Sequence, residues 1–186
     1  IRDAQESRGL GDVYKRQEFA FSRFLVPYLC NYSGHAIFMD CDMLSRSDIS
    51  ELWRQRTTKY AVQCVQHDYT PTSTIKFMNQ PQTPYPKKNW SSMMIFNNGH
   101  EDCKKLTPEV VNTASGQFLH QFEWTNSISK IPHNKIATEG YDERVEESHH
   151  AVHYTRGGPW IKGMDYSHIN MLDLYEKHKK GLPNST

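Results

Sequence analysis

Three absences limit the classes of protein to which this 186-residue sequence can belong. It has no apolar run long enough to span a bilayer, because its most apolar stretch, residues 21–30, is short and contains Arg23. It has almost no net charge, with 22 Lys and Arg against 21 Asp and Glu, and this predicts no nucleic-acid partner. Its four cysteines show no CxxC spacing and no signal peptide is evident, so we expect reduced thiols in the cytoplasm.

The composition and the residue patterns indicate one globular domain that follows a short non-native segment. Hydrophobic residues make up 37% of the chain and aromatic residues 12%, which is enough for a core. Residues 1–17 are polar and follow neither a helix nor a strand period. The stretch DVYKRQ within them resembles the translation of a transposon-end adapter, so we expect residues 1–17 to be non-native. The alternative is a disordered native tail. The domain would then occupy residues 18–186.

Helix and strand patterns alternate along that domain, which predicts an α/β fold. Short apolar runs typical of buried strands occur at 36–40, 60–65, 92–97 and 151–155. Helical patterns occur at 18–30, 47–53, 107–122 and 164–181. Residues 69–90 are rich in Pro, Thr and Asn and are predicted to form a long irregular loop.

Two carboxylates follow the first of these strands. Asp40 and Asp42 come directly after the apolar run 36–39. In open α/β sheets ligands bind at the carboxyl ends of strands, and two oxygen donors there suit Mg²⁺ or Mn²⁺. The alternative is a pair of solvated or capping aspartates at a strand end, which this motif alone leaves open.

A second cluster of polar residues lies in HHAVHYTRGGPW, residues 149–160. The strand predicted at 151–155 carries His153, which is a suitable third ligand for Mn²⁺. Gly157 and Gly158 would let the backbone approach a diphosphate, and Arg156 supplies charge-assisted donors to phosphate. The alternative is a hydrogen-bonded histidine beside a tight turn.

The order of four segments along the chain resembles that of glycosyltransferase family 8. These segments are FSRFLVPYL, AIFMDCDML, a strand ending at Asn97, and HYTRGGPW. The resemblance implies a GT-A-type, Rossmann-like mixed sheet flanked by helices. It implies transfer of a sugar, with retention, from a nucleotide-diphosphate sugar of the UDP type to a carbohydrate or glycoconjugate acceptor, with Mn²⁺ or Mg²⁺ as cofactor.

The resemblance also implies roles for individual residues. Asp40, Asp42 and His153 would be the metal ligands, and both aspartates would be catalytic. Arg23 would be a catalytic residue that faces the donor sugar and diphosphate. Further positions that would contact the diphosphate or the sugars are Arg156, Gly157, Gly158, Ser91 and Ser92.

The sequence departs from the family pattern at four places. The segment Trp90–Ser92 lacks the family's glycine, and Gly158 stands where many relatives carry a lysine, so Arg156 would supply the cation. Phe118 stands where the family has an acidic residue, which Gln117 or Asp142 would have to replace. The family's first, base-binding strand has no counterpart upstream of residue 18, so we expect an N-terminally truncated domain.

Three other functions remain open at this point. A metal-dependent nucleotidyltransferase would use the same strand-end carboxylates, although the sequence lacks its usual N-terminal Gly-rich phosphate loop. A non-catalytic module could bind a sugar or a protein through the aromatic loop at 67–90. The chain could also be an inactive fragment without a nucleotide pocket.

Overall fold

The structure is a computed structural model that describes residues 19–67, 86–132, 136–139, 142, 144–155, 158–160 and 171–181, and the backbone of 75–76 and 80–81. The predictions for residues 1–17, Arg156 and Gly157 lie outside these residues, as does most of the loop predicted at 69–90.

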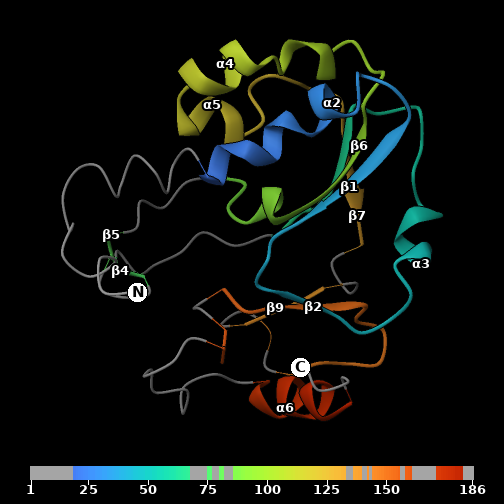
Figure 1. The fold of residues 1–186 in the computed structure, drawn as a ribbon, viewed down its shortest axis with the longest axis vertical. Helices are drawn as coiled ribbons and strands as arrows, with labels where there is room; N and C mark the ends of the chain where they lie inside the picture. The colour runs from blue at the N-terminus through green and yellow to red at the C-terminus, as the bar shows by residue number, and fades with distance from the viewer. Residues whose placement is uncertain are drawn as a thin grey trace, which may run out of the picture.

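Short helices and strands alternate along the described chain (Figure 1), and this confirms the predicted α/β class. The helices are η1 (Ser22–Leu25), α2 (Val26–Leu29), α3 (Ser50–Trp53), η3 (Trp90–Ser92), η4 (Cys103–Lys105), α4 (Pro108–Thr113), α5 (Gly116–His120) and α6 (Leu172–Lys180). The strands are β1 (His35–Met39), β2 (Met43–Ser45), β3 (Val62–Val65), β4 (Ile75–Lys76), β5 (Gln80–Pro81), β6 (Met93–Asn97), β7 (Ile128–Ile131), β8 (Ile136–Thr138) and β9 (Ala151–His153). Among the described helices, none has both the length and the apolar character needed to cross a membrane.

The main sheet is mixed, with the strand order β1-β6-β3-β7. Strand β6 is antiparallel to both β1 and β3, whereas β3 and β7 are parallel. Because β6 runs against β1, its first residue, Met93, lies opposite the last residue of β1, Met39. The residues that follow β1 therefore meet the residues that precede β6 at one edge of the sheet.

Both faces of the main sheet are covered, which explains why β6 is a continuous apolar run rather than an alternating one. Met94 and Phe96 pack into a cluster with residues of the helical layer, including Phe24, Val111 and Leu119. Met93 and Ile95 point to the opposite face, where a second cluster contains Leu52 of α3 together with side chains of β8 and β9.

A second, smaller sheet has the strand order β2-β9-β8. Strand β2 pairs antiparallel with β9 and places Met43 opposite His153, while β8 runs parallel to β9. Leu174 and Tyr175 of α6 pack against this sheet, and Figure 1 shows α6 at the opposite end of the molecule from α4 and α5. The segment 40–42 is the direct link from β1 to β2, so the two aspartates lie where the two sheets meet.

The single helix predicted at 107–122 is wrong, because the structure divides this segment into α4 and α5. The first helix begins as predicted, with the Thr107 hydroxyl accepting a hydrogen bond from the Val110 N–H. Ala114 is extended, and Ser115 then caps a new helix by accepting from the Phe118 N–H. A second good N-cap in the middle of a helical pattern thus starts a separate helix with its own direction.

Candidate metal site at the junction of the two sheets

The backbone of the Asp-Cys-Asp segment is held at both ends by neighbouring strands. The Asp40 N–H donates to the carbonyl oxygen of Ser92, at the start of β6, over 2.9 Å. The carbonyl oxygen of Asp42 accepts from the N–H of Tyr154, directly after β9, over 3.0 Å. Each aspartate is therefore attached to a different sheet, and the short turn between them holds both side chains at the same edge.

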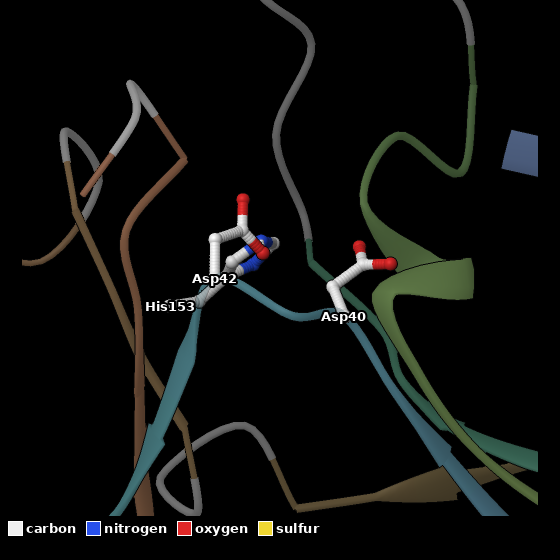
Figure 2. A group of neighbouring side chains, drawn as sticks. All are labelled: Asp40, Asp42 and His153. Carbon is white, nitrogen blue, oxygen red and sulfur yellow. Dashed lines mark ion pairs between the residues drawn. The ribbon is translucent and has the colours of Figure 1, made fainter. Parts of the chain in front are cut away.

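His153 completes a group of three potential metal ligands. Its Nε2 atom lies 3.3 Å from Oδ1 of Asp42, and ligand atoms of Asp40, Asp42 and His153 all lie within 4.8 Å of one another. Figure 2 shows the Asp42 carboxyl group and the His153 imidazole pointing toward one another, with Asp40 a short turn away. Residues from β9 and from the β1–β2 link, more than a hundred positions apart in the sequence, thus converge as predicted.

The chemistry of these side chains fits a divalent cation. Two carboxylates and one imidazole form a donor set suited to Mn²⁺. In the described part of the chain, neither the buried Oδ1 of Asp42 nor the buried Nδ1 of His153 has a hydrogen-bond partner. Buried polar atoms are normally paired, and among the described residues this Asp42 oxygen contacts Nε2 of His153 in an ion pair, so a cation bound between the two side chains would satisfy both facing atoms.

Arg23 lies against Asp40 rather than in open solvent. Its Nη2 is 2.9 Å from Oδ1 of Asp40, and its Nη1 donates to Oδ2 over 3.2 Å and to the Ser91 carbonyl over 2.9 Å. Its Nε also donates to the Ala20 carbonyl. The arginine, predicted to face the donor, therefore makes its resolved contacts with a proposed metal ligand and with the segment before β6.

The charges around Asp40 act on its pKa in opposite directions. Burial raises the pKa of Asp40 above its ordinary value, while the Arg23 guanidinium lowers it. The neighbouring Asp42 raises it again and His153 lowers it, and the net result is a raised pKa. A carboxyl group next to a second carboxylate in a partly buried site is expected to behave this way, and a bound cation would relieve the repulsion between them.

Ser91 and Ser92 lie at the same edge, but their hydroxyl groups bond within the protein. Both residues are buried, with exposed fractions of 5% and 4%. The Ser92 hydroxyl donates to the Asn89 carbonyl over 2.7 Å, and Oγ of Ser91 lies 2.8 Å from Nδ1 of His120. The predicted contacts of these serines with sugars stay a prediction.

Gly158 has a structural reason to be glycine. A Cβ atom added there would lie 1.8 Å from an atom of the Trp160 ring, so no larger residue fits without moving the indole. Trp160 in turn packs against Tyr154 and against Tyr175 of α6. The proximity of this glycine to a diphosphate stays a prediction, as do the roles of Arg156 and Gly157, which lie outside the described residues.

Comparisons with known proteins bear on the relatives and on the fold of this chain. No family model matches the sequence. The sequence is 47% identical over 174 residues to Protein CDI of Arabidopsis thaliana, covering 88% of this chain and 67% of that protein. The chain belongs to the same family as Protein CDI.

The fold resembles that of LgtC, a glycosyltransferase, in the crystal structure of an active-site mutant. The TM-score is 0.51 at 9% sequence identity, with 90% of this chain and 68% of that chain covered. At this identity the likeness concerns the fold alone, and it confirms the predicted GT-A-type arrangement of a mixed sheet flanked by helices.

Gln117 and Asp142, considered as replacements for the acidic residue of glycosyltransferase family 8, each make a local hydrogen bond. Gln117 donates from Nε2 to Oε1 of Glu123 at the surface. Oδ2 of Asp142 accepts from the N–H of Thr138 over 2.6 Å and so holds the turn after β8. Both contacts give these side chains local structural roles.

The structure also contains an acid that the sequence analysis did not single out. Glu139 is fully buried directly after β8, and its N–H donates to the His153 carbonyl over 2.9 Å. The signal was present, because an apolar run at 136–138 is followed by an acid just as the run at 36–39 is followed by Asp40. It was missed because a three-residue strand is too short to show a period.

The four thiols are expected to differ in reactivity. All are free; Cys41, between the two aspartates, is exposed, whereas Cys64 and Cys103 are buried, and burial raises the pKa of both to about 12. An aromatic disulfide reagent should therefore label Cys41 quickly and reach Cys64 and Cys103 only after denaturation. Stopped-flow absorbance with Cys41→Ser in a Cys30→Ser background tests this, because Cys30 is half-buried, and a fast phase that survives both substitutions would contradict it.

Proposed function

We propose that this protein is a metal-dependent glycosyltransferase that transfers a sugar, with retention, from a UDP-sugar to a carbohydrate or glycoconjugate acceptor. The observation that carries the proposal is the convergence of Asp40, Asp42 and His153 at the edge of a GT-A-type sheet. The resemblance of the motif order to glycosyltransferase family 8 supports the same conclusion independently of the coordinates.

The three ligands would divide their work as follows. A bound Mn²⁺ or Mg²⁺ would act as a Lewis acid that neutralises charge on the departing nucleoside diphosphate. Asp42 and His153 would hold the cation through the pair of atoms that face each other, and Asp40 would add a second carboxylate from the other sheet. Arg23 would keep that carboxylate in place, because its two terminal nitrogens contact both oxygens.

The residues of the predicted diphosphate subsite would complete the site. Arg156 and the backbone at Gly157 and Gly158 would stabilise the same leaving group, since they follow His153 by only a few residues. Ser91 and Ser92 would lie next to the donor and acceptor sugars at the same edge of the sheet.

A thermal-shift titration tests the binding step. Uridine diphosphate at a hundred times its dissociation constant, with Mn²⁺ present, should stabilise the protein by about 2.7 kcal/mol. For a chain of this size that is a rise in Tm of about 5–10 °C. The rise should vanish without Mn²⁺ and in Asp42→Ala, but persist in Asp173→Ala, which removes an exposed aspartate of α6. A shift of equal size without metal would overturn the proposal.

Product analysis separates transfer of a sugar from transfer of a nucleotide. With a panel of UDP-sugars and simple glycoside acceptors, release of uridine diphosphate supports glycosyl transfer. Release of the sugar 1-phosphate together with a uridylylated acceptor would instead favour a nucleotidyltransferase. Binding of a partner that is unchanged in chelator and in Asp42→Ala would favour a non-catalytic module.

A further inference from the structure

His120 makes a partly buried polar contact that no part of the proposed reaction uses. It is the last residue of α5, and its Nδ1 lies 2.8 Å from the hydroxyl oxygen of Ser91. Its ring stands edge-on to Phe24 at 5.2 Å and tilted to Phe21 at 5.7 Å. Ser91 is 5% exposed and two phenylalanine rings pack against the half-buried imidazole, so this hydrogen bond is partly shielded from water.

The same serine is bonded to the metal site through its backbone. The Ser91 carbonyl accepts from Nη1 of Arg23, and the terminal nitrogens of Arg23 contact both carboxylate oxygens of Asp40. The next residue, Ser92, accepts the N–H of Asp40. A continuous series of contacts thus leads from His120 to Asp40, through the side chain and the carbonyl of Ser91 and the guanidinium of Arg23.

The segment that carries Ser91 needs such a side-chain anchor. It is a three-residue helix, η3, preceded by Asn89 with φ 62° and by Lys87 with φ 64°, a conformation uncommon for residues other than glycine. Its own backbone bonds are long, at 3.2 Å for both Trp90 N–H to Lys87 and Ser92 N–H to Asn89. Short helices of this kind have poor hydrogen-bond geometry, so the contact with α5 fixes an orientation that the segment itself fixes weakly.

We propose that His120 is a positioning residue of the metal site, which acts through Ser91 and Arg23 to hold the Asp40 carboxylate where it can coordinate. The inference rests on the proposed function in one respect, namely that Asp40, Asp42 and His153 bind a divalent cation. It assigns His120 no contact with substrate or metal.

The test measures Mn²⁺ affinity by calorimetric titration, with Tm recorded for every variant. His120→Leu keeps apolar bulk but loses the hydrogen bond, and it should weaken Mn²⁺ binding about tenfold, the lower end of the range for residues behind metal ligands. His120→Asn can still bond Ser91 and should recover most of the affinity. His178→Leu is the matched control, because His178 is also a partly buried helical histidine bonded through Nδ1, in this case to Leu174 of α6.

The Arg23→Met variant tests whether the effect of His120 on Asp40 passes through Arg23. In Arg23→Met the link between Ser91 and Asp40 is absent, so adding His120→Leu should change Mn²⁺ affinity little further. Equal losses in His120→Leu and His120→Asn, or additive losses in the Arg23→Met background, would overturn the inference. If the wild type binds Mn²⁺ and His120→Leu binds it equally well, the inference about His120 is overturned and the proposed function stands. No Mn²⁺ binding by the wild type would overturn both.

Discussion

Asp42→Asn is expected to weaken Mn²⁺ binding by more than about 100-fold. Replacing a residue that only hydrogen-bonds to a metal ligand already lowers metal affinity about 10–100-fold, and Asp42 is a proposed ligand itself. Asp42 supplies the buried Oδ1 that faces Nε2 of His153. An amide oxygen in that position carries no charge and leaves the imidazole and Asp40 as the remaining ligands.

The same substitution should leave the fold intact, which makes the loss specific. Burial, and to a smaller extent the Asp42 charge, raise the pKa of Asp40, so Asp40 holds its proton to higher pH in the folded chain than in the unfolded one. Stability from that group is therefore lost as the pH rises through the folded pKa, and removing the Asp42 charge reduces this loss. Asp42→Asn should be unchanged or slightly more stable at neutral pH, by no more than about 1 kcal/mol.

Calorimetric titration with Mn²⁺ and urea unfolding of the same samples check the two parts of this prediction. Asp173→Asn, at an exposed position of α6, is the control for a lost negative charge. Retention of wild-type Mn²⁺ affinity in Asp42→Asn would remove this residue from the metal site. A large fall in stability would mean that the Asp42 carboxylate has a structural role that its contacts do not reveal.

The parts of the site that could be predicted are those carried by strand ends. A short apolar run followed by acids, at 36–42, predicts both β1 and the place of Asp40 and Asp42. The strand before His153 is predicted by the same reasoning. These predictions succeed because strand burial and the position of the next polar residue are local properties of the sequence.

The register of the sheet could not be predicted, and it decides which segments share the site. Ser91 lies beside Asp40 because β6 runs antiparallel to β1 and pairs Met93 with Met39. An apolar strand covered on both faces has no alternation that would reveal its direction or its partner. Strands β2, β4, β5, β7 and β8 were missed because each has only two to four residues, which mix polar and apolar side chains and form no apolar run.

The partners of polar side chains were the least predictable. Arg23 could be placed on the helix before β1, but its pairing with Asp40 depends on how that helix packs against the sheet. The contact between Ser91 and His120 joins two segments 29 residues apart, and neither lies in a recognisable motif. Such contacts follow from tertiary packing, which a single sequence does not display.

Phe96→Ala is expected to lower the free energy of unfolding by about 3–5 kcal/mol, the usual cost of removing a buried phenylalanine side chain. Phe96 is 0% exposed on β6, which lies between β1 and β3 in the main sheet. Its ring stacks on Trp124 at 6.5 Å and packs with the cluster under the helical layer. The cavity would therefore open where the sheet meets the helices and where little room exists for collapse.

Urea unfolding monitored by tryptophan fluorescence measures this loss, and Phe19→Ala is the matched control. Phe19 is 72% exposed, so its removal should change stability by no more than about 0.5 kcal/mol. Below the unfolding transition, Phe96→Ala should still bind Mn²⁺, because Ser92, which accepts the Asp40 N–H, lies before the first residue of β6, whereas Phe96 lies near its last residue. Similar stabilities for Phe96→Ala and Phe19→Ala would mean that β6 is not the centre of the core. Loss of Mn²⁺ binding in a folded Phe96→Ala protein would mean that the helical face of β6 controls the site more directly than the contacts indicate.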